Sequence, residues 1–66
     1  SVVQQALQEL SEDHRAILVL REMEGFSYEQ IADIAGISIG TVRSRLSRAR
    51  AQLKNIIEAS SEDPLN

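Results

Sequence analysis

Hydrophobic residues recur at helical spacing in four stretches of the chain. The spacing predicts helices over about 2–10, 12–23 and 28–35, and a longer fourth helix that starts after Ser38. The second stretch is apolar nearly all round, which is typical of a central helix covered on several sides. The fold expected is therefore all-α, a compact domain of four helices with no sheet. The apolar side chains expected in its core are Leu7, Ile17, Leu20, Ile31, Ile34, Val42 and Leu46.

Serine and glycine residues mark the predicted ends of these helices. Ser11, Ser27 and Ser38 each precede a helical stretch, where a hydroxyl can accept from an exposed backbone N–H. Gly25 and Gly36 follow helical stretches, and glycine takes the left-handed conformation that ends many helices at little steric cost. The helical period is lost from about Ala59. We therefore expect a domain over residues 1–59 and a disordered acidic tail over 60–66.

The third and fourth helices are separated by only three residues, the first of them Gly36. Such a short connection is typical of a helix-turn-helix, and small Ala32 and Ala35 would allow the two helices to approach closely. The second helix of this motif crosses the first steeply, which leaves its outer face free to enter the major groove of DNA.

The fourth helix carries the positive charge of an otherwise acidic chain. The net charge is −3, and residues 1–37 hold seven acidic and two basic side chains. Residues 38–54 hold no acid and five bases: Arg43, Arg45, Arg48, Arg50 and Lys54. Because charges are screened over about 10 Å at moderate salt, the distant acids subtract little from the local attraction to phosphate.

The face of this helix opposite its apolar stripe is small, polar and edged with cations. At helical spacing Ser44, Ser47 and Arg48 lie outermost, with Gly40 and Ala51 beside them. Small polar side chains suit base edges, and long cations at the margins suit phosphates. The alternative is an ordinary solvated face of an amphipathic helix.

Composition argues against enzymatic and metal chemistry. A chain of 66 residues buries too little surface for a deep catalytic cleft, and it has no cysteine. His14 has no second histidine to share a metal, so we expect a solvated residue there and neither a metal nor a cofactor. Glu29 and Asp33 are interpreted as a solvated acidic face. The longest apolar run, 16–20, cannot span a membrane, so we expect a cytoplasmic protein without membrane contact.

Four strings carry a resemblance to a known family: the Leu-rich opening before Ser11, LRExxG at 20–25, SYEQIA at 27–32, and GTVRSRLxRAR at 40–50. With them, residues 3–57 resemble the C-terminal promoter-recognition domain, region 4, of a bacterial extracytoplasmic-function (ECF) sigma factor. Members often have proline at the positions of Ser11 and Ser38. They can also carry a larger side chain at the position of Ser47.

The resemblance implies a winged-helix-like domain of the sigma region 4 type that binds the minus-35 promoter element during transcription initiation. It also implies two protein partners, the β flap of the RNA polymerase core and an anti-sigma factor. The family's base contacts fall on Arg43, Ser44, Ser47 and Arg48. Its contacts to the DNA backbone fall on Arg21, Tyr28, Thr41, Arg45 and Arg50.

Two other functions stay open from the sequence. One is the output domain of a response regulator, which has a similar helix-turn-helix core and binds half-sites as a dimer. The other is a protein-interaction module that uses the basic helix against an acidic partner. For single residues, Tyr28 could pack instead of touching phosphate, and Arg21 could form a surface ion pair with Glu22 or Glu24.

Overall fold

The computed structural model describes residues 1–61 of the chain, and within them every regular element is helical. The helices are α1 (Val2–Glu9), α2 (Glu12–Leu18), α3 (Tyr28–Ala35) and α4 (Ile39–Ser61), with a π-helical segment, η1 (Val19–Met23), directly after α2. The prediction of an all-α domain of four helices is confirmed.

Each predicted cap is present at the predicted serine or glycine. The Ser27 hydroxyl accepts from the backbone N–H of Gln30, and the Gln30 side chain accepts in return from the N–H of Ser27, which closes a capping box. The Ser38 hydroxyl accepts from the N–H of Thr41 at 3.1 Å, so it caps α4. Gly25 and Gly36 both have positive φ, 74° and 68°, as expected of glycines that end helices.

The second predicted helix is not uniform. Its last turn and a half is η1, where the Glu24 N–H donates to the Val19 carbonyl at 3.0 Å, five residues back. Periodicity did not reveal this widening, because the stretch is apolar nearly all round and no single period stands out. π-segments are often found at functional sites, and η1 provides two of the charged residues discussed below.

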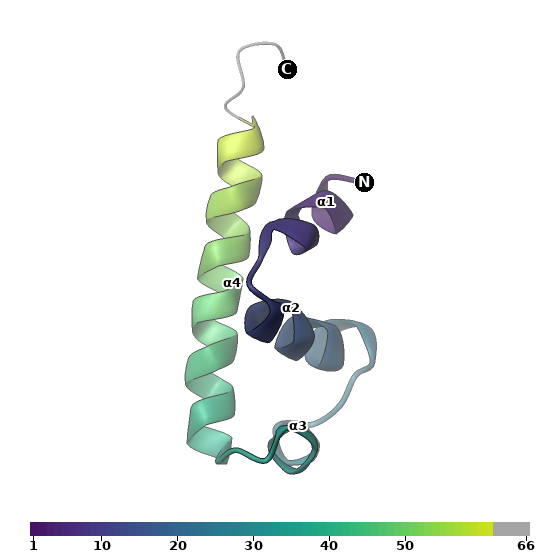
Figure 1. Ribbon diagram of the computed structural model, residues 1–66, viewed down its shortest axis with the longest axis vertical. Coiled ribbons are helices and arrows are strands. Elements are labelled where there is room, and N and C mark those ends of the chain that lie inside the picture. Colours follow the sequence, from purple (N-terminus) through teal and green to yellow (C-terminus); the bar gives the residue numbers. More distant parts are fainter. Residues whose placement is uncertain (62–66) are drawn as a thin grey trace.

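Helix α4 is the element against which the others pack. Figure 1 shows it as a long rod, with α1, α2 and α3 stacked along one side of it. Its inner face contributes Val42, Leu46 and Ala49, all almost completely buried. They join a core of side chains from the other three α-helices: Leu7, Leu10, Ile17, Leu18, Ile31 and Ala32.

Three sequence expectations about burial need correction. Ile34 was expected in the core but is 56% exposed, because two-turn α3 is covered only by α4 and η1, and Ile31 and Ala32 occupy that contact. The second stretch is not covered on all sides, since Met23 is 58% exposed. Val2 and Val3, expected on the packed face of the first helix, are each about half exposed.

The predicted end of the domain also needs adjustment. Helix α4 continues through Ser61, two residues beyond the expected boundary at 59. Helical hydrogen bonds require only the preceding turn, so loss of apolar period does not by itself end a helix. The rest of the predicted tail, 62–66, lies outside the described residues.

Candidate nucleic-acid interface

Helix α4 is held across α3 at a steep angle. In Figure 1 α4 runs along the long axis of the molecule, whereas α3 is seen nearly end-on at its foot. The connection through Gly36 and Ser38 is short because the Gly36 turn is left-handed and the Ser38 cap starts the next helix at once. The first three turns of α4 therefore project past α3, as a helix-turn-helix requires.

The residues predicted to touch bases lie on the outer side of these turns. Val42 and Leu46 are 0% and 1% exposed, while Arg43, Ser44, Ser47 and Arg48 are all exposed. The helical-wheel prediction of which face is buried is thus confirmed. Contact of these four side chains with bases stays a prediction.

The hydroxyl groups on this face differ in what they can still bind. Ser44 Oγ donates to the Thr41 carbonyl of its own helix at 3.2 Å, which leaves its lone pairs facing outward. Thr41 is half-buried, and its own hydroxyl lies 2.9 Å from that of Ser38. Thr41 therefore helps to close the first turn of α4, and its predicted phosphate contact stays a prediction.

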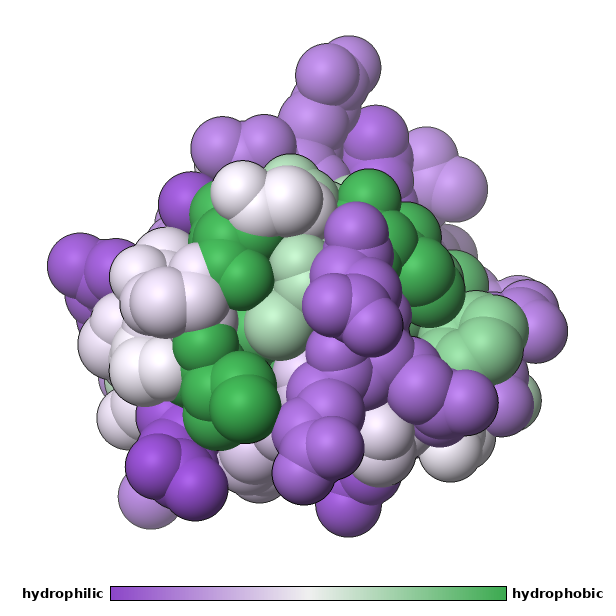
Figure 2. Space-filling model, turned by 90° about the horizontal axis from the view of Figure 1, so that it is seen from below, coloured by the Kyte–Doolittle hydropathy of each residue, from purple (hydrophilic) through white to green (hydrophobic). Residues whose placement is uncertain are grey.

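The end of the molecule formed by α3 and the start of α4 is not uniformly basic. Figure 2 views this end and shows hydrophobic residues among hydrophilic ones. Ile34 of α3 and Ile39 of α4 are both exposed there. The cations instead lie along the flanks of α4: at helical spacing Arg43 and Arg50 share one edge, and half-buried Arg45 lies on the other.

Arg21 and Tyr28, both predicted to touch the DNA backbone, lie together beside α3. The Arg21 guanidinium donates to the Phe26 carbonyl at 2.8 Å and lies 4.9 Å from the centre of the Tyr28 ring. Its η1 position thus holds the loop that leads into α3, and the alternative ion pair with Glu22 or Glu24 is absent from the described contacts. Tyr28 packs against the core, so its packing interpretation is correct as far as the ring is concerned.

Arg50, the other predicted phosphate contact on this side, is bound to an acid that sequence reasoning missed. Its Nη2 and Nε donate to Oε1 of Glu22 at 2.6 and 3.1 Å. The Glu22 carboxylate, with a smaller contribution from Tyr28, raises the pKa of Arg50 above its ordinary value. Glu22 and Arg50 are 28 residues apart, so no local pattern in the sequence could pair them.

His14 does not behave as the free, solvated residue expected. It is half-buried, and its Nδ1 lies within hydrogen-bond distance of Oε1 of Gln52 on α4. Across the part of the chain that is described, no three His, Cys, Asp or Glu side chains come together as a metal site.

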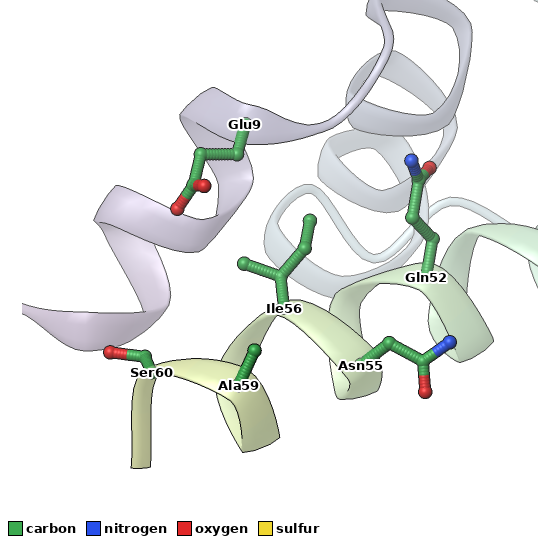
Figure 3. Close-up of a pocket in the computed structure, with 6 residues that line it drawn as sticks. All are labelled: Glu9, Gln52, Asn55, Ile56, Ala59 and Ser60. Atoms are coloured by element: carbon green, nitrogen blue, oxygen red, sulfur yellow. The ribbon is translucent and has the colours of Figure 1, made fainter. Parts of the chain in front are cut away.

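A shallow depression between α1 and the far end of α4 has the lining of an ordinary surface hollow. Its volume is about 510 Å³, and its lining residues are Glu9, Gln52, Asn55, Ile56, Ala59 and Ser60. Figure 3 shows Glu9 reaching in from α1 while the other five side chains come from α4. The set includes one carboxylate and no nucleophile–base pair, so it does not support catalysis.

Helix α4 is also the only described helix long enough to be considered as a membrane span. It has 23 residues, but its charged side chains make it too polar for the bilayer core.

A short helix that props a longer one at a steep angle, with the outer face of the longer helix exposed and flanked by arginines, defines a helix-turn-helix domain of the DNA-binding type. The family described as "Sigma-70, region 4" matches residues 1–53 of the chain. The chain belongs to this family, as its sequence motifs predicted, and the match favours it over the response-regulator alternative.

Curated relatives give the same assignment. The chain is 47% identical over 58 residues to the RNA polymerase sigma-H factor of Pseudomonas aeruginosa, covering 88% of this chain and 30% of that protein. It is 46% identical over 57 residues to the ECF RNA polymerase sigma-E factor of Haemophilus influenzae, covering 86% and 30%. With the ECF RNA polymerase sigma factor SigE of Mycolicibacterium smegmatis the identity is 43% over 61 residues, covering 92% and 24%.

A solved structure is similar as well. The sigma factor RpoE from Bartonella quintana, crystallised with the anti-sigma factor NepR, superposes with a TM-score of 0.78 at 45% identity, covering 85% of this chain and 35% of that one. The chain thus spans roughly a third or less of the length of these relatives.

Proposed function

We propose that this chain binds the minus-35 element of a promoter as the C-terminal domain of an RNA polymerase sigma factor of the ECF group. Arg43, Ser44, Ser47 and Arg48 of α4 contact base edges in the major groove. Phosphates on either side bind to Arg21, Tyr28, Thr41, Arg45 and Arg50. The domain acts in the cytoplasm by binding alone and has no catalytic step.

One observation carries this proposal. The exposed face of α4 is continuous from Gly40 to Ala51, and the buried face directly behind it is fixed by Val42, Leu46 and Ala49. A face so held needs little rearrangement to enter a groove. An acidic protein partner would also bind arginines, but it would not require the small residues at the centre of the face.

Arg48 provides the sharpest test of base reading. It is exposed, and replacing it by alanine should not disturb the helix, because alanine is the best helix former. We expect Arg48→Ala to weaken the selected duplex by about 1–3 kcal/mol, or about 5- to 150-fold, and a scrambled duplex much less.

The duplex for this test comes from selection of bound sequences out of a random double-stranded library. Fluorescence anisotropy at several salt concentrations then gives the affinities of both duplexes. Arg48→Lys is the matched control, because it keeps the charge and loses the bidentate geometry that reads guanine. Selection without an enriched sequence, or equal losses on both duplexes, would contradict base reading by α4.

We also propose the partners that the family implies, the RNA polymerase core through its β flap and an anti-sigma factor. The relatives are named RNA polymerase sigma factors, and one similar structure contains an anti-sigma factor. The surface that suits the flap is an apolar hollow of about 190 Å³ between α1, η1 and α4. Its lining includes Val3 and Met23, which are about half exposed although hydrophobic.

Met23→Lys should therefore weaken binding to purified core polymerase while leaving duplex binding unchanged. Ile34→Lys is the control, since Ile34 is equally exposed but lies on α3 outside the hollow. Equal effects of both substitutions on polymerase binding would exclude the hollow as the docking surface.

A further inference from the structure

Among the charged groups on the predicted phosphate-binding side, Arg50 alone is already held by an acid. Its guanidinium donates twice to Oε1 of Glu22, across the contact between η1 and α4. Arg43, Arg45, Arg48 and Lys54 take part in no ion pair found in residues 1–61. One of the five cations of α4 is therefore neutralised within the domain itself.

The ion pair is suited to being exchanged. The two side chains are 47% and 54% exposed, so water and salt screen their attraction and the pair stabilises the domain little. Because both hydrogen bonds converge on one carboxylate oxygen, a single displacement frees the whole Nε edge of the guanidinium. A DNA phosphate offers Arg50 the same charge-assisted bonds.

The neighbouring cation cannot take over this role freely. Arg21 is already bound to the Phe26 carbonyl and covers the Tyr28 ring, so it is fixed in place. Tyr28 also contributes to the environment of Arg50. Arg50 is thus the group at this corner whose partner can change.

We propose that Glu22 is an internal competitor of DNA phosphate for Arg50, which lowers the sequence-independent affinity of the domain. This inference rests on the proposed DNA binding. To reach a phosphate, Arg50 must leave Glu22, and the carboxylate then stays close to the polyanion without a partner. The attraction gained at the phosphate is reduced by both effects, and the same reduction applies to every DNA sequence because phosphates carry no sequence information.

The test measures affinity for a scrambled duplex, by anisotropy, across a range of salt concentrations. We expect Glu22→Gln to tighten binding about 1.5- to 5-fold, the range that exposed ion pairs span. The slope of log affinity against log salt should steepen by about 0.9, the value for one more phosphate neutralised. Partial unfolding of the variant would weaken binding, so it could not imitate this result.

Glu24→Gln is the matched control, because it removes the same charge two residues away from a side chain without an ion pair among the described residues. It should have a smaller effect than Glu22→Gln. In an Arg50→Gln background, Glu22→Gln should have no more effect than Glu24→Gln. Equal effects of the two substitutions in the unaltered chain, or weaker binding by Glu22→Gln, would overturn the proposal.

The use of a scrambled duplex separates this inference from promoter recognition. If selection finds no preferred sequence but Glu22→Gln still tightens binding, promoter reading fails and the competition stands. If a preferred sequence is found and Glu22→Gln changes neither affinity nor slope, the competition fails and promoter reading stands.

Discussion

Gly40 is the position at which stability and DNA binding should respond in opposite directions. It is the second residue of α4, exposed, and without a positive φ. A Cβ added there would meet only Ser38 Oγ at 3.9 Å, an ordinary van der Waals distance. Alanine therefore fits the free domain without strain. Because glycine within a helix is less stable than alanine by about 0.5–1 kcal/mol, we expect Gly40→Ala to raise the free energy of unfolding by that amount.

Binding should change the other way if α4 enters the groove. Gly40 lies one turn before Ser44 on the same face, so the new methyl group projects toward the duplex. Holding the helix away from the bases would cost about 1.5–3 kcal/mol, the size of one charge-assisted hydrogen bond, or about 10- to 150-fold in affinity. A backbone that must approach a ligand closely is a common reason for glycine.

The assay compares thermal unfolding by circular dichroism with duplex binding by anisotropy. A domain of this size should gain about 2–8 °C in melting temperature. Asn55→Ala is the control, because it also improves helix propensity at an exposed position of α4, but three turns and more from Ser44. It should raise the melting temperature and leave binding unchanged. If Gly40→Ala binds DNA as tightly as the unaltered chain, the face around Gly40 does not lie in the groove.

Three further substitutions test the support of the recognition face. Leu46→Ala should cost about 2–5 kcal/mol of unfolding free energy in urea titrations, because the side chain is 1% exposed; a loss below about 1 kcal/mol would contradict its central position. Gly36→Ala should cost about 1–2 kcal/mol, all of it backbone strain, since no atom lies within 4 Å of the added Cβ. Gly36→Asn should cost less, and equal losses for the two would argue against a left-handed turn. Ser38→Ala should lower stability by about 1 kcal/mol through loss of the acceptor for the Thr41 N–H, and an unchanged melting temperature would show that this cap is not needed.

Features that depend on nearby residues could be predicted from the sequence. The capping box of Ser27 and Gln30 and the left-handed Gly36 involve contacts within four residues, so the pattern specifies them directly. The same holds for the outer face of α4, because helix geometry alone puts Ser44, Ser47 and Arg48 opposite Val42 and Leu46.

Features that depend on how the helices meet could not be predicted. The Glu22–Arg50 pair and the His14–Gln52 contact join residues 28 and 38 positions apart. Ile34 shows the converse, since its spacing resembles that of a core residue but no described element covers it. The start of η1 at Val19 is likewise hidden in a stretch that is apolar on all sides.

These observations imply that one helix separates two kinds of mutational effect by face. Substitutions at Val42, Leu46 or Ala49 should act on folding, because these side chains have no exposed surface to offer a ligand. Substitutions at Ser47 or Arg48 should act on binding, since exposed helix positions far from caps and core change stability little. Arg50 lies at the margin between the faces, where its ion pair belongs to the fold and its charge to DNA. It is therefore the residue of α4 for which a stability measurement and a binding measurement must be made together, because neither effect can be understood without the other.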